Sequence, residues 1–226
     1  MAEAVIVFHD KLWLFGGATH VKLDFTADQL VNDVWTSEDG LSWTQVTDAA
    51  PWSPLDDPKV IVSGDALCLL GAEGRADVWR STDGKNWTQL TAEAPWKPRH
   101  GYDPIVFDGK LWVYGGYGFS SSKDVFNDVW YSSDGTTWVQ QAEHAPWGPR
   151  DPLSVVFQDK LWIFSGKHTG GTDSWAGDVW QMTATPQTTS PLGFRTAGRR
   201  VTQRSRTPTT GSPNPGPSLF GCLSSV

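Results

Sequence analysis

SSDGTTW, residues 132–138, is the stretch that decides how this chain folds, because it recurs as SEDGLSW at 37–43 and STDGKNW at 81–87. In each copy the Asp-Gly pair predicts a tight turn, since the Asp side chain can accept hydrogen bonds from turn amides and Gly takes a positive φ without strain. The Trp that follows would begin the next strand and cover the gap to a neighbouring unit. The predicted hairpin residues are Asp39, Gly40, Trp43, Asp83, Gly84, Trp87, Asp134, Gly135 and Trp138.

The hairpin belongs to a larger repeat. DVW occurs at 33–35, 77–79, 128–130 and 178–180, and before each copy lie two short apolar runs, the second of which ends in small residues, as in KLWVYGG at 110–116. This order predicts four short strands per unit, which we call a, b, c and d, with turns between them. Four antiparallel strands repeated every ~45 residues are typical of propeller blades. The predicted blades span 4–49, 60–91, 104–141 and 153–182.

The repeat resembles the kelch repeat over residues 4–182. A glycine pair ends strand b at Gly16–Gly17 and Gly115–Gly116, departs to Gly71–Ala72 and Ser165–Gly166, and is followed by the Trp of strand c and the Trp of strand d. The hairpin also resembles the Asp box of bacterial sialidases, with one residue fewer between Asp and Trp. The resemblance implies an all-β, galactose-oxidase-like propeller, a fold that in this family usually has six or seven blades.

The fourth unit loses the pattern after DVWQM. Ala184, Thr185 and Thr188 stand where the turn Asp, the turn Gly and the Trp of strand d are expected. Residues 183–226 are rich in Pro, Ser, Thr and Arg, which predicts a disordered tail. The sequence therefore predicts three and three-quarter blades. Three interpretations stay open: a fragment or frameshifted product of a longer propeller, a tight four-bladed ring, or a ring completed by another chain.

Charge and composition exclude some classes of function. The net charge is −7, and because the tail of residues 183–226 carries five Arg and no acid, the body is −12. An acidic body argues against nucleic-acid binding. No apolar run approaches the ~18 residues of a membrane span, and no signal peptide is recognisable, so we expect no membrane partner and, by default, a cytoplasmic location. The two cysteines, Cys68 in an apolar run and Cys222 in the tail, predict no disulfide framework.

Strand direction places the b–c loops and the d–a linkers on one face of the propeller, where variable loops commonly carry function. Arg99 and Arg150 occupy matching linker positions, whereas the first linker has Leu55. This pair is the best candidate for binding an anionic partner, and otherwise we expect salt bridges to loop acids. Trp52, Trp96 and Trp147 recur in the linkers and are expected to pack on the neighbouring blade. The alternative is an aromatic platform on which a sugar ring or a cation stacks. The candidate ligand-binding residues are Arg99, His100, Tyr102, Tyr117, Arg150, Asp151, His168 and Trp175.

Catalytic motifs are absent from the sequence. It has no GxSxG, HExxH, P-loop or CxxC, its five His are scattered, and no Tyr adjoins Cys68, so we expect no catalytic residue, metal or cofactor. Asp56, Asp57, Asp103 and Asp151 lie on linkers that converge, and a carboxylate pair among them is conceivable. We expect a non-catalytic scaffold that binds a protein or glycan. The alternatives are a carbohydrate-active enzyme, such as a kelch-type epimerase or oxidase or a sialidase-like enzyme, or a remnant of one.

Overall fold

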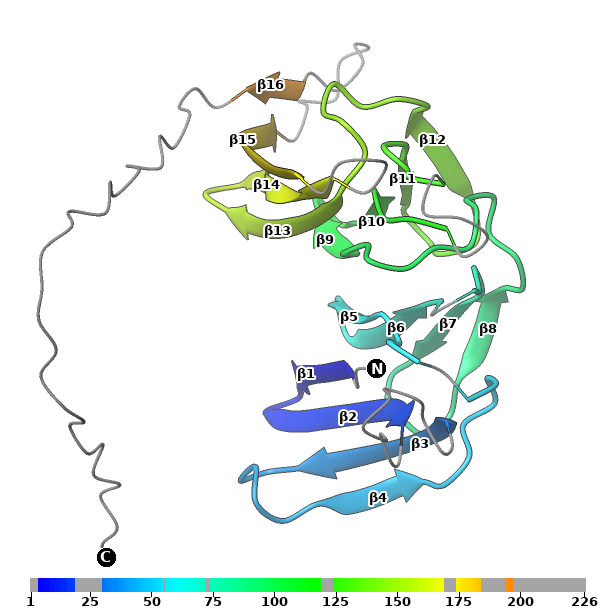
Figure 1. The fold of residues 1–226 in the computed structure, drawn as a ribbon. Coiled ribbons are helices and arrows are strands. Elements are labelled where there is room, and N and C mark those ends of the chain that lie inside the picture. The colour runs from blue at the N-terminus through cyan, green and yellow to red at the C-terminus, as the bar shows by residue number, and fades with distance from the viewer. Residues whose placement is uncertain are drawn as a thin grey trace, which may run out of the picture.

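The protein is a β-propeller arc in a computed structural model that describes residues 4–18, 30–54, 56–71, 74–118, 124–168, 174–183 and 194–196. The regular elements in these ranges are strands, arranged as four antiparallel sheets of four strands each. The sheets stand side by side around an open centre (Figure 1), with β1 beside β5, β5 beside β9 and β9 beside β13 at the inner edge. The predicted all-β propeller of four-stranded blades is confirmed.

Each sheet follows chain order, so its first strand is innermost and its last is outermost. Blade 1 contains β1 (Ala4–Phe8), β2 (Lys11–Ala18), β3 (Leu30–Ser37) and β4 (Thr44–Thr47). Blade 2 contains β5 (Val60–Ser63), β6 (Ala66–Leu70), β7 (Val78–Ser81) and β8 (Thr88–Thr91). Blade 3 contains β9 (Ile105–Phe107), β10 (Lys110–Tyr114), β11 (Val129–Ser132) and β12 (Trp138–Ala142). Blade 4 contains β13 (Asp151–Phe157), β14 (Lys160–His168), β15 (Ser174–Thr183) and β16 (Phe194–Thr196).

Strand β16 corrects the prediction that the fourth blade has no outer strand. It pairs antiparallel with β15 in the register Trp180↔Thr196, Gln181↔Arg195 and Met182↔Phe194. It is only three residues long and lies within the segment predicted to be a disordered tail. Thr183, the first residue of that predicted tail, ends β15, and apart from β16 the rest of the tail lies outside the described residues. The outer position of blade 4 is thus filled by a segment that carries no hairpin motif.

The blades are held together by three apolar clusters, one at each junction. Between blades 1 and 2, Trp13 and Phe15 of β2 pack with Leu67 and Leu69 of β6. Cys68 belongs to the next cluster, where it is 3 % exposed and a free thiol, as expected for a small buried apolar residue. In blades 2 and 3, which have a neighbour on each side, the b strands β6 and β10 are buried on both faces, which explains why they are apolar at nearly every position.

The Asp-Gly hairpins connect strands c and d in blades 1 to 3 and have one geometry. In blade 3, the Asp134 carboxylate accepts hydrogen bonds from the backbone N–H groups of Thr136 (2.8 Å) and Thr137 (2.7 Å), and Gly135 has φ +75°. Asp39 and Asp83 accept the equivalent bonds, and Gly40 and Gly84 share the positive φ. The recurring phrase therefore has a structural role in these three blades.

Candidate functional site

The d–a linkers and the b–c loops meet at one end of the blades. The backbone of His100, in the linker from blade 2 to blade 3, exchanges two 2.9 Å hydrogen bonds with Tyr117, which begins the b–c loop of blade 3. The N–H of Gly116, in the same loop, donates to the carbonyl of Arg150 in the next linker at 2.8 Å. The two kinds of loop therefore build one surface, which we call the loop face.

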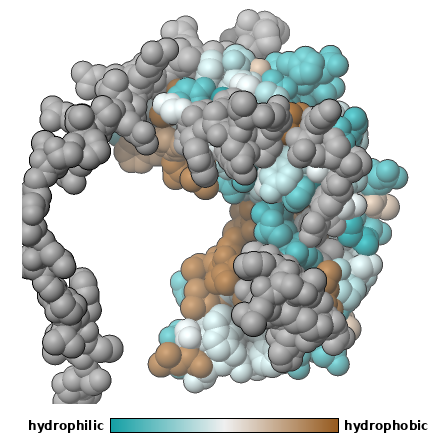
Figure 2. Space-filling view, in the orientation of Figure 1, coloured by the Kyte–Doolittle hydropathy of each residue, from teal (hydrophilic) through white to brown (hydrophobic). Residues whose placement is uncertain are grey.

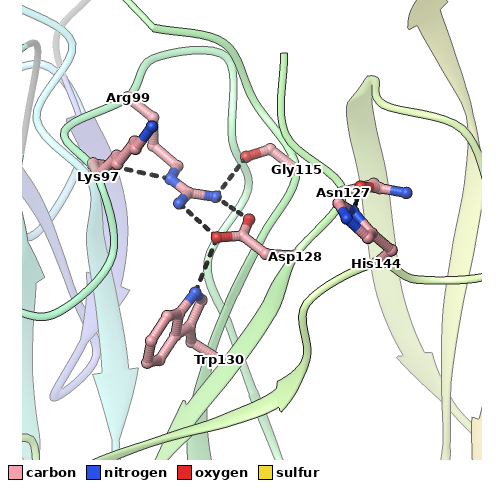
Figure 3. A network of polar contacts seen from close by, with 7 residues as sticks. All are labelled: Lys97, Arg99, Gly115, Asn127, Asp128, Trp130 and His144. Carbon is pink, nitrogen blue, oxygen red and sulfur yellow. Dashed lines mark hydrogen bonds and ion pairs between the residues drawn. The ribbon is translucent and has the colours of Figure 1, made fainter. Parts of the chain in front are cut away.

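Arg99 is buried in an ion pair rather than open to ligands. Its side chain is 0 % exposed. The guanidinium donates to both carboxylate oxygens of Asp128, at 2.6 and 2.9 Å, and to the carbonyl of Gly115 at 2.9 Å (Figure 3). Asp128 also accepts a hydrogen bond from Nε1 of Trp130, the Trp of the DVW motif, at 2.8 Å. Arg99 thus ties the linker to strands b and c of its blade.

Arg150 repeats this arrangement in blade 4. It is 1 % exposed and donates to both carboxylate oxygens of Asp178, whose other partner is Nε1 of Trp180. Burial alone would raise the pKa of Asp178, but the hydrogen bonds from Arg150 and Trp180 outweigh it and lower that pKa. The expectation that Arg99 and Arg150 bind an anionic partner needs correction, because both guanidinium groups are occupied by carboxylates of the protein's own fold.

Blade 2 explains why the absence of Arg at position 55 was misleading. There the guanidinium comes from Arg75, two residues before the Asp of the DVW motif. Its Nε and Nη2 atoms donate to Asp77 at 3.4 and 3.1 Å, and Asp77 accepts the usual bond from Trp79 at 2.8 Å. The RAD sequence at 75–77 was the signal that could have revealed the structural role of arginine. Blades 2, 3 and 4 therefore share one Arg–Asp–Trp arrangement with two different origins for the arginine.

Tyr102 is also buried, with 2 % of its surface exposed, and its hydroxyl donates to the carbonyl of Leu70 in the preceding blade. Burial raises the pKa of this phenol. Tyr102 therefore joins blades 2 and 3 and does not offer its hydroxyl to a ligand. The candidates His168 and Trp175 lie at the ends of β14 and β15, but their side chains are outside the described residues.

Two of the remaining candidates form an aromatic pair on the loop face. The rings of His100 and Tyr117 lie with centroids 3.8 Å apart, and both residues are half-buried. Because the two backbones are also paired, the rings are held in a fixed position. The rings are tilted by 51° to each other, so each partly exposed ring can offer its own face to a sugar ring or to a side chain.

Titratable groups from the two preceding linkers lie near Asp151, at the start of β13. Burial raises the pKa of this carboxyl; the negative charges of Asp103 and Asp57 raise it further, and the positive charges of Lys59 and His100 oppose them. Lys59 pairs with Asp57 at 2.8 Å, and Asp103 accepts hydrogen bonds from the hydroxyl and N–H of Ser154, at 2.7 and 3.0 Å. We call the following set the loop-face cluster: Asp57, Lys59, His100, Asp103, Tyr117 and Asp151.

The linker tryptophans lie inside the blade junctions, as their repetition predicted. Trp52 is 2 % exposed and packs edge-on against Trp87 of the hairpin in blade 2, with ring centroids 4.6 Å apart. Trp96 contacts Trp138 in the same way at 4.1 Å. These indole rings are therefore unavailable as a binding platform.

No group of three or more His, Cys, Asp or Glu side chains in the described parts of the chain is arranged to hold a metal ion. Within those same ranges, no helix has the length and apolar character needed to cross a bilayer.

The fold and the loop-face cluster define a β-propeller with a polar, partly aromatic loop surface. Comparison with known proteins found no matching family model and no matching curated protein. Among solved structures, that of a protein called YjhT is similar, with a TM-score of 0.66 and 16 % sequence identity. The match covers 89 % of this chain and 65 % of the YjhT chain, so this chain spans less than two thirds of that structure. At this identity the likeness concerns the fold alone.

Proposed function

We propose that this protein is a non-catalytic binding scaffold of the kelch type, whose b–c loops and d–a linkers contact a glycan or a protein. The observation that supports this function is the loop-face cluster, which gathers a rigid aromatic pair and several charged groups from three successive linkers. Rigid scaffolds that present recognition groups on loops are the usual way in which propellers and similar folds bind ligands.

The charge of the cluster determines which ligands fit. The cluster brings together three carboxyl side chains, those of Asp57, Asp103 and Asp151, but only two basic side chains, those of Lys59 and His100. The two buried arginines cannot contribute, because each is paired with its own carboxylate. A neutral or cationic ligand with several hydrogen-bond donors, such as a neutral oligosaccharide or a basic peptide, therefore fits this surface better than an anionic one.

The test is a binding panel measured by isothermal titration calorimetry. Neutral, anionic and cationic oligosaccharides and peptides are titrated into the full chain, and the tightest ligand is then titrated into two variants. Tyr117→Ala removes one ring of the aromatic pair, and Asp151→Asn removes a cluster charge; each is expected to weaken binding about tenfold or more, the loss of about 1.4 kcal/mol. Asp108→Asn, in the exposed a–b turn at the other end of blade 3, is the matched control and should bind normally. Preference for anionic ligands, or equal binding by all variants, would contradict the proposal.

One observation favours an enzyme as the second candidate. The carboxyl of Asp151 has a raised pKa and lies near that of Asp103, and a perturbed carboxyl beside another is a common basis for acid–base chemistry on sugars. A carbohydrate-active enzyme would convert sugars that the panel identifies, and the products can be followed by NMR. If Asp151→Asn retains binding and loses turnover, the protein is an enzyme; if no ligand is converted, the scaffold is supported.

A further inference from the structure

The two ends of the blade arc expose apolar faces. We call the side of a blade that faces the next blade its front face and the opposite side its rear face. On the rear face of blade 1, Val5 and Val7 are 60 % and 64 % exposed, and on the front face of blade 4, Leu153 and Phe157 are 69 % and 58 % exposed. Figure 2 shows hydrophobic surface on both of these blades, along the concave side of the arc. Apolar surface of this kind marks an interaction site.

The junction between blades 1 and 2 shows what such faces bind when they are covered. Aromatic residues on the front face of blade 1, namely Phe8, Trp13 and Phe15, pack with aliphatic residues on the rear face of blade 2, including Leu67 and Leu69. These five residues are all at most 6 % exposed. The junction between blades 1 and 2 therefore consists of an aromatic front face packed against a rear face of aliphatic side chains and indole rings.

The exposed rear face of blade 1 repeats the covered rear face of blade 2. In β1 and β2, Val5 lies opposite Leu14, just as Val60 lies opposite Leu69 in β5 and β6. The same registers place the Trp of each DVW motif beside the second leucine. Six equivalent positions carry the same residue type in the two blades. In blade 1 they are Val5, Val7, Leu12, Leu14, Trp35 and Trp43, which correspond in this order to Val60, Val62, Leu67, Leu69, Trp79 and Trp87 in blade 2.

The exposed front face of blade 4 repeats the covered front face of blade 1. Nε1 of Trp162 donates to the carbonyl of Phe157 at 3.0 Å, as Nε1 of Trp13 donates to the carbonyl of Phe8 at 2.9 Å. Four equivalent positions carry the same residue type in the two blades. In blade 4 they are Phe157, Trp162, Phe164 and Val179, which correspond in this order to Phe8, Trp13, Phe15 and Val34 in blade 1. Phe8 in blade 1 is 3 % exposed, whereas its equivalent Phe157 in blade 4 is 58 % exposed, because no described residue covers Phe157.

We propose that these two faces bind each other between two copies of this chain, head to tail, so that the front face of blade 4 in one copy covers the rear face of blade 1 in the other. The contact reproduces the junction of blades 1 and 2 with the same side chains at the main positions. Within one chain the two faces lie at opposite ends of the arc (Figure 1). Two copies joined at both junctions close a ring of eight blades by a twofold rotation, within the range of ~4–8 blades that propellers have.

The test is the mass of the full chain in solution, measured by light scattering coupled to size exclusion. The unmodified protein is expected at twice the chain mass of 24.9 kDa. Val7→Asp on the rear face and Phe157→Asp on the front face each place a charge in every junction, so each variant alone should have the mass of one copy. Both sites are more than half exposed in the single chain, so neither change should unfold it. Val139→Asp, at an exposed site on the outer strand of blade 3, is the matched control and should keep the double mass.

An equimolar mixture of the two variants separates this proposal from other forms of association. In the mixture, the intact front face of the Val7→Asp chain can bind the intact rear face of the Phe157→Asp chain, so the double mass should return at one junction. A symmetric contact between two like faces would give no such recovery and would leave one of the variants dimeric alone. A single-copy mass for the unmodified protein, or a dimer that survives both substitutions, would overturn the proposal.

Discussion

Gly84, in the hairpin of blade 2, provides the sharpest test of how the blades pack. A Cβ at this position would lie 2.1 Å from Cζ3 of Trp13 in blade 1, far inside van der Waals contact. The indole cannot simply move, because it is 6 % exposed, its Nε1 is bound to the carbonyl of Phe8, and its ring stacks on Phe15. Gly84→Ala therefore disturbs the junction between blades 1 and 2 as well as the turn.

The cost of the substitution has two parts. An alanine at φ +72° costs about 1–2 kcal/mol in backbone strain. Overpacking against the buried indole adds about 1–3 kcal/mol. The free energy of unfolding should fall by about 3 kcal/mol, which for a domain of this size corresponds to a fall in Tm of about 6–12 °C.

Gly64→Ala is the matched control, because Gly64 has a similar φ of +62° and its Cβ would meet nothing within 4 Å. Strain alone then lowers the free energy of unfolding, by about 1–2 kcal/mol. Both variants are measured by urea unfolding, followed by Trp fluorescence. Equal losses of stability in the two variants would refute the claim that the hairpin glycine is required by contact with the neighbouring blade.

Three further predictions concern side chains. Arg99→Leu leaves the carboxylate of Asp128 without its main partner and should lower the free energy of unfolding by about 3 kcal/mol or more in the same urea assay. The control is Arg80→Leu, which breaks the exposed ion pair with Asp65 and should lower the free energy of unfolding by at most about 1 kcal/mol. The thiol of Cys68 is buried and its pKa is raised to about 11, so in a Cys222→Ser variant, titration with a disulfide reagent should detect no thiol until urea unfolds the chain. Hydrogen bonds from turn amides lower the pKa of the hairpin carboxyls of Asp39, Asp83 and Asp134, to about 2 for Asp39. The contribution of these carboxyls to stability is therefore present above about pH 4 and is lost as the pH falls towards 2. In a variant with Asn at all three positions, the urea midpoint should fall less steeply over this pH range than in the unmodified protein.

Strand order in the first three blades could be predicted because its signals are local. The DVW and Asp-Gly-Trp phrases mark strands c and d by turn chemistry and alternation, which act within a few residues. Strand β16 could not be predicted in this way. The segment Phe194–Thr196 is not preceded by the Asp-Gly phrase of the other blades, and its strand is defined by pairing with the outer edge of β15.

The candidate site shows the same division. The sequence placed Arg99 and Arg150 on the correct face, but their partners, Asp128 and Asp178, lie 29 and 28 positions away along the chain. The choice between a ligand and an internal carboxylate depends on which atoms converge after folding. Local spacing contains no information on that choice, except for the short RAD sequence at Arg75 and Asp77.

By itself, the sequence determined the repeating blade, the hairpins with their Asp and Gly, and the common face of the b–c loops and d–a linkers, since all of these follow from short-range backbone preferences and strand direction. Only the tertiary structure decided which candidate residues are buried within the fold and which lie half-buried on the loop face. It buried both arginines and Tyr102, left the residues of the loop-face cluster half-buried, and exposed two complementary apolar faces at the ends of the arc. These outcomes depend on contacts between blades, where burial and charge pairing are set by residues far apart in the chain.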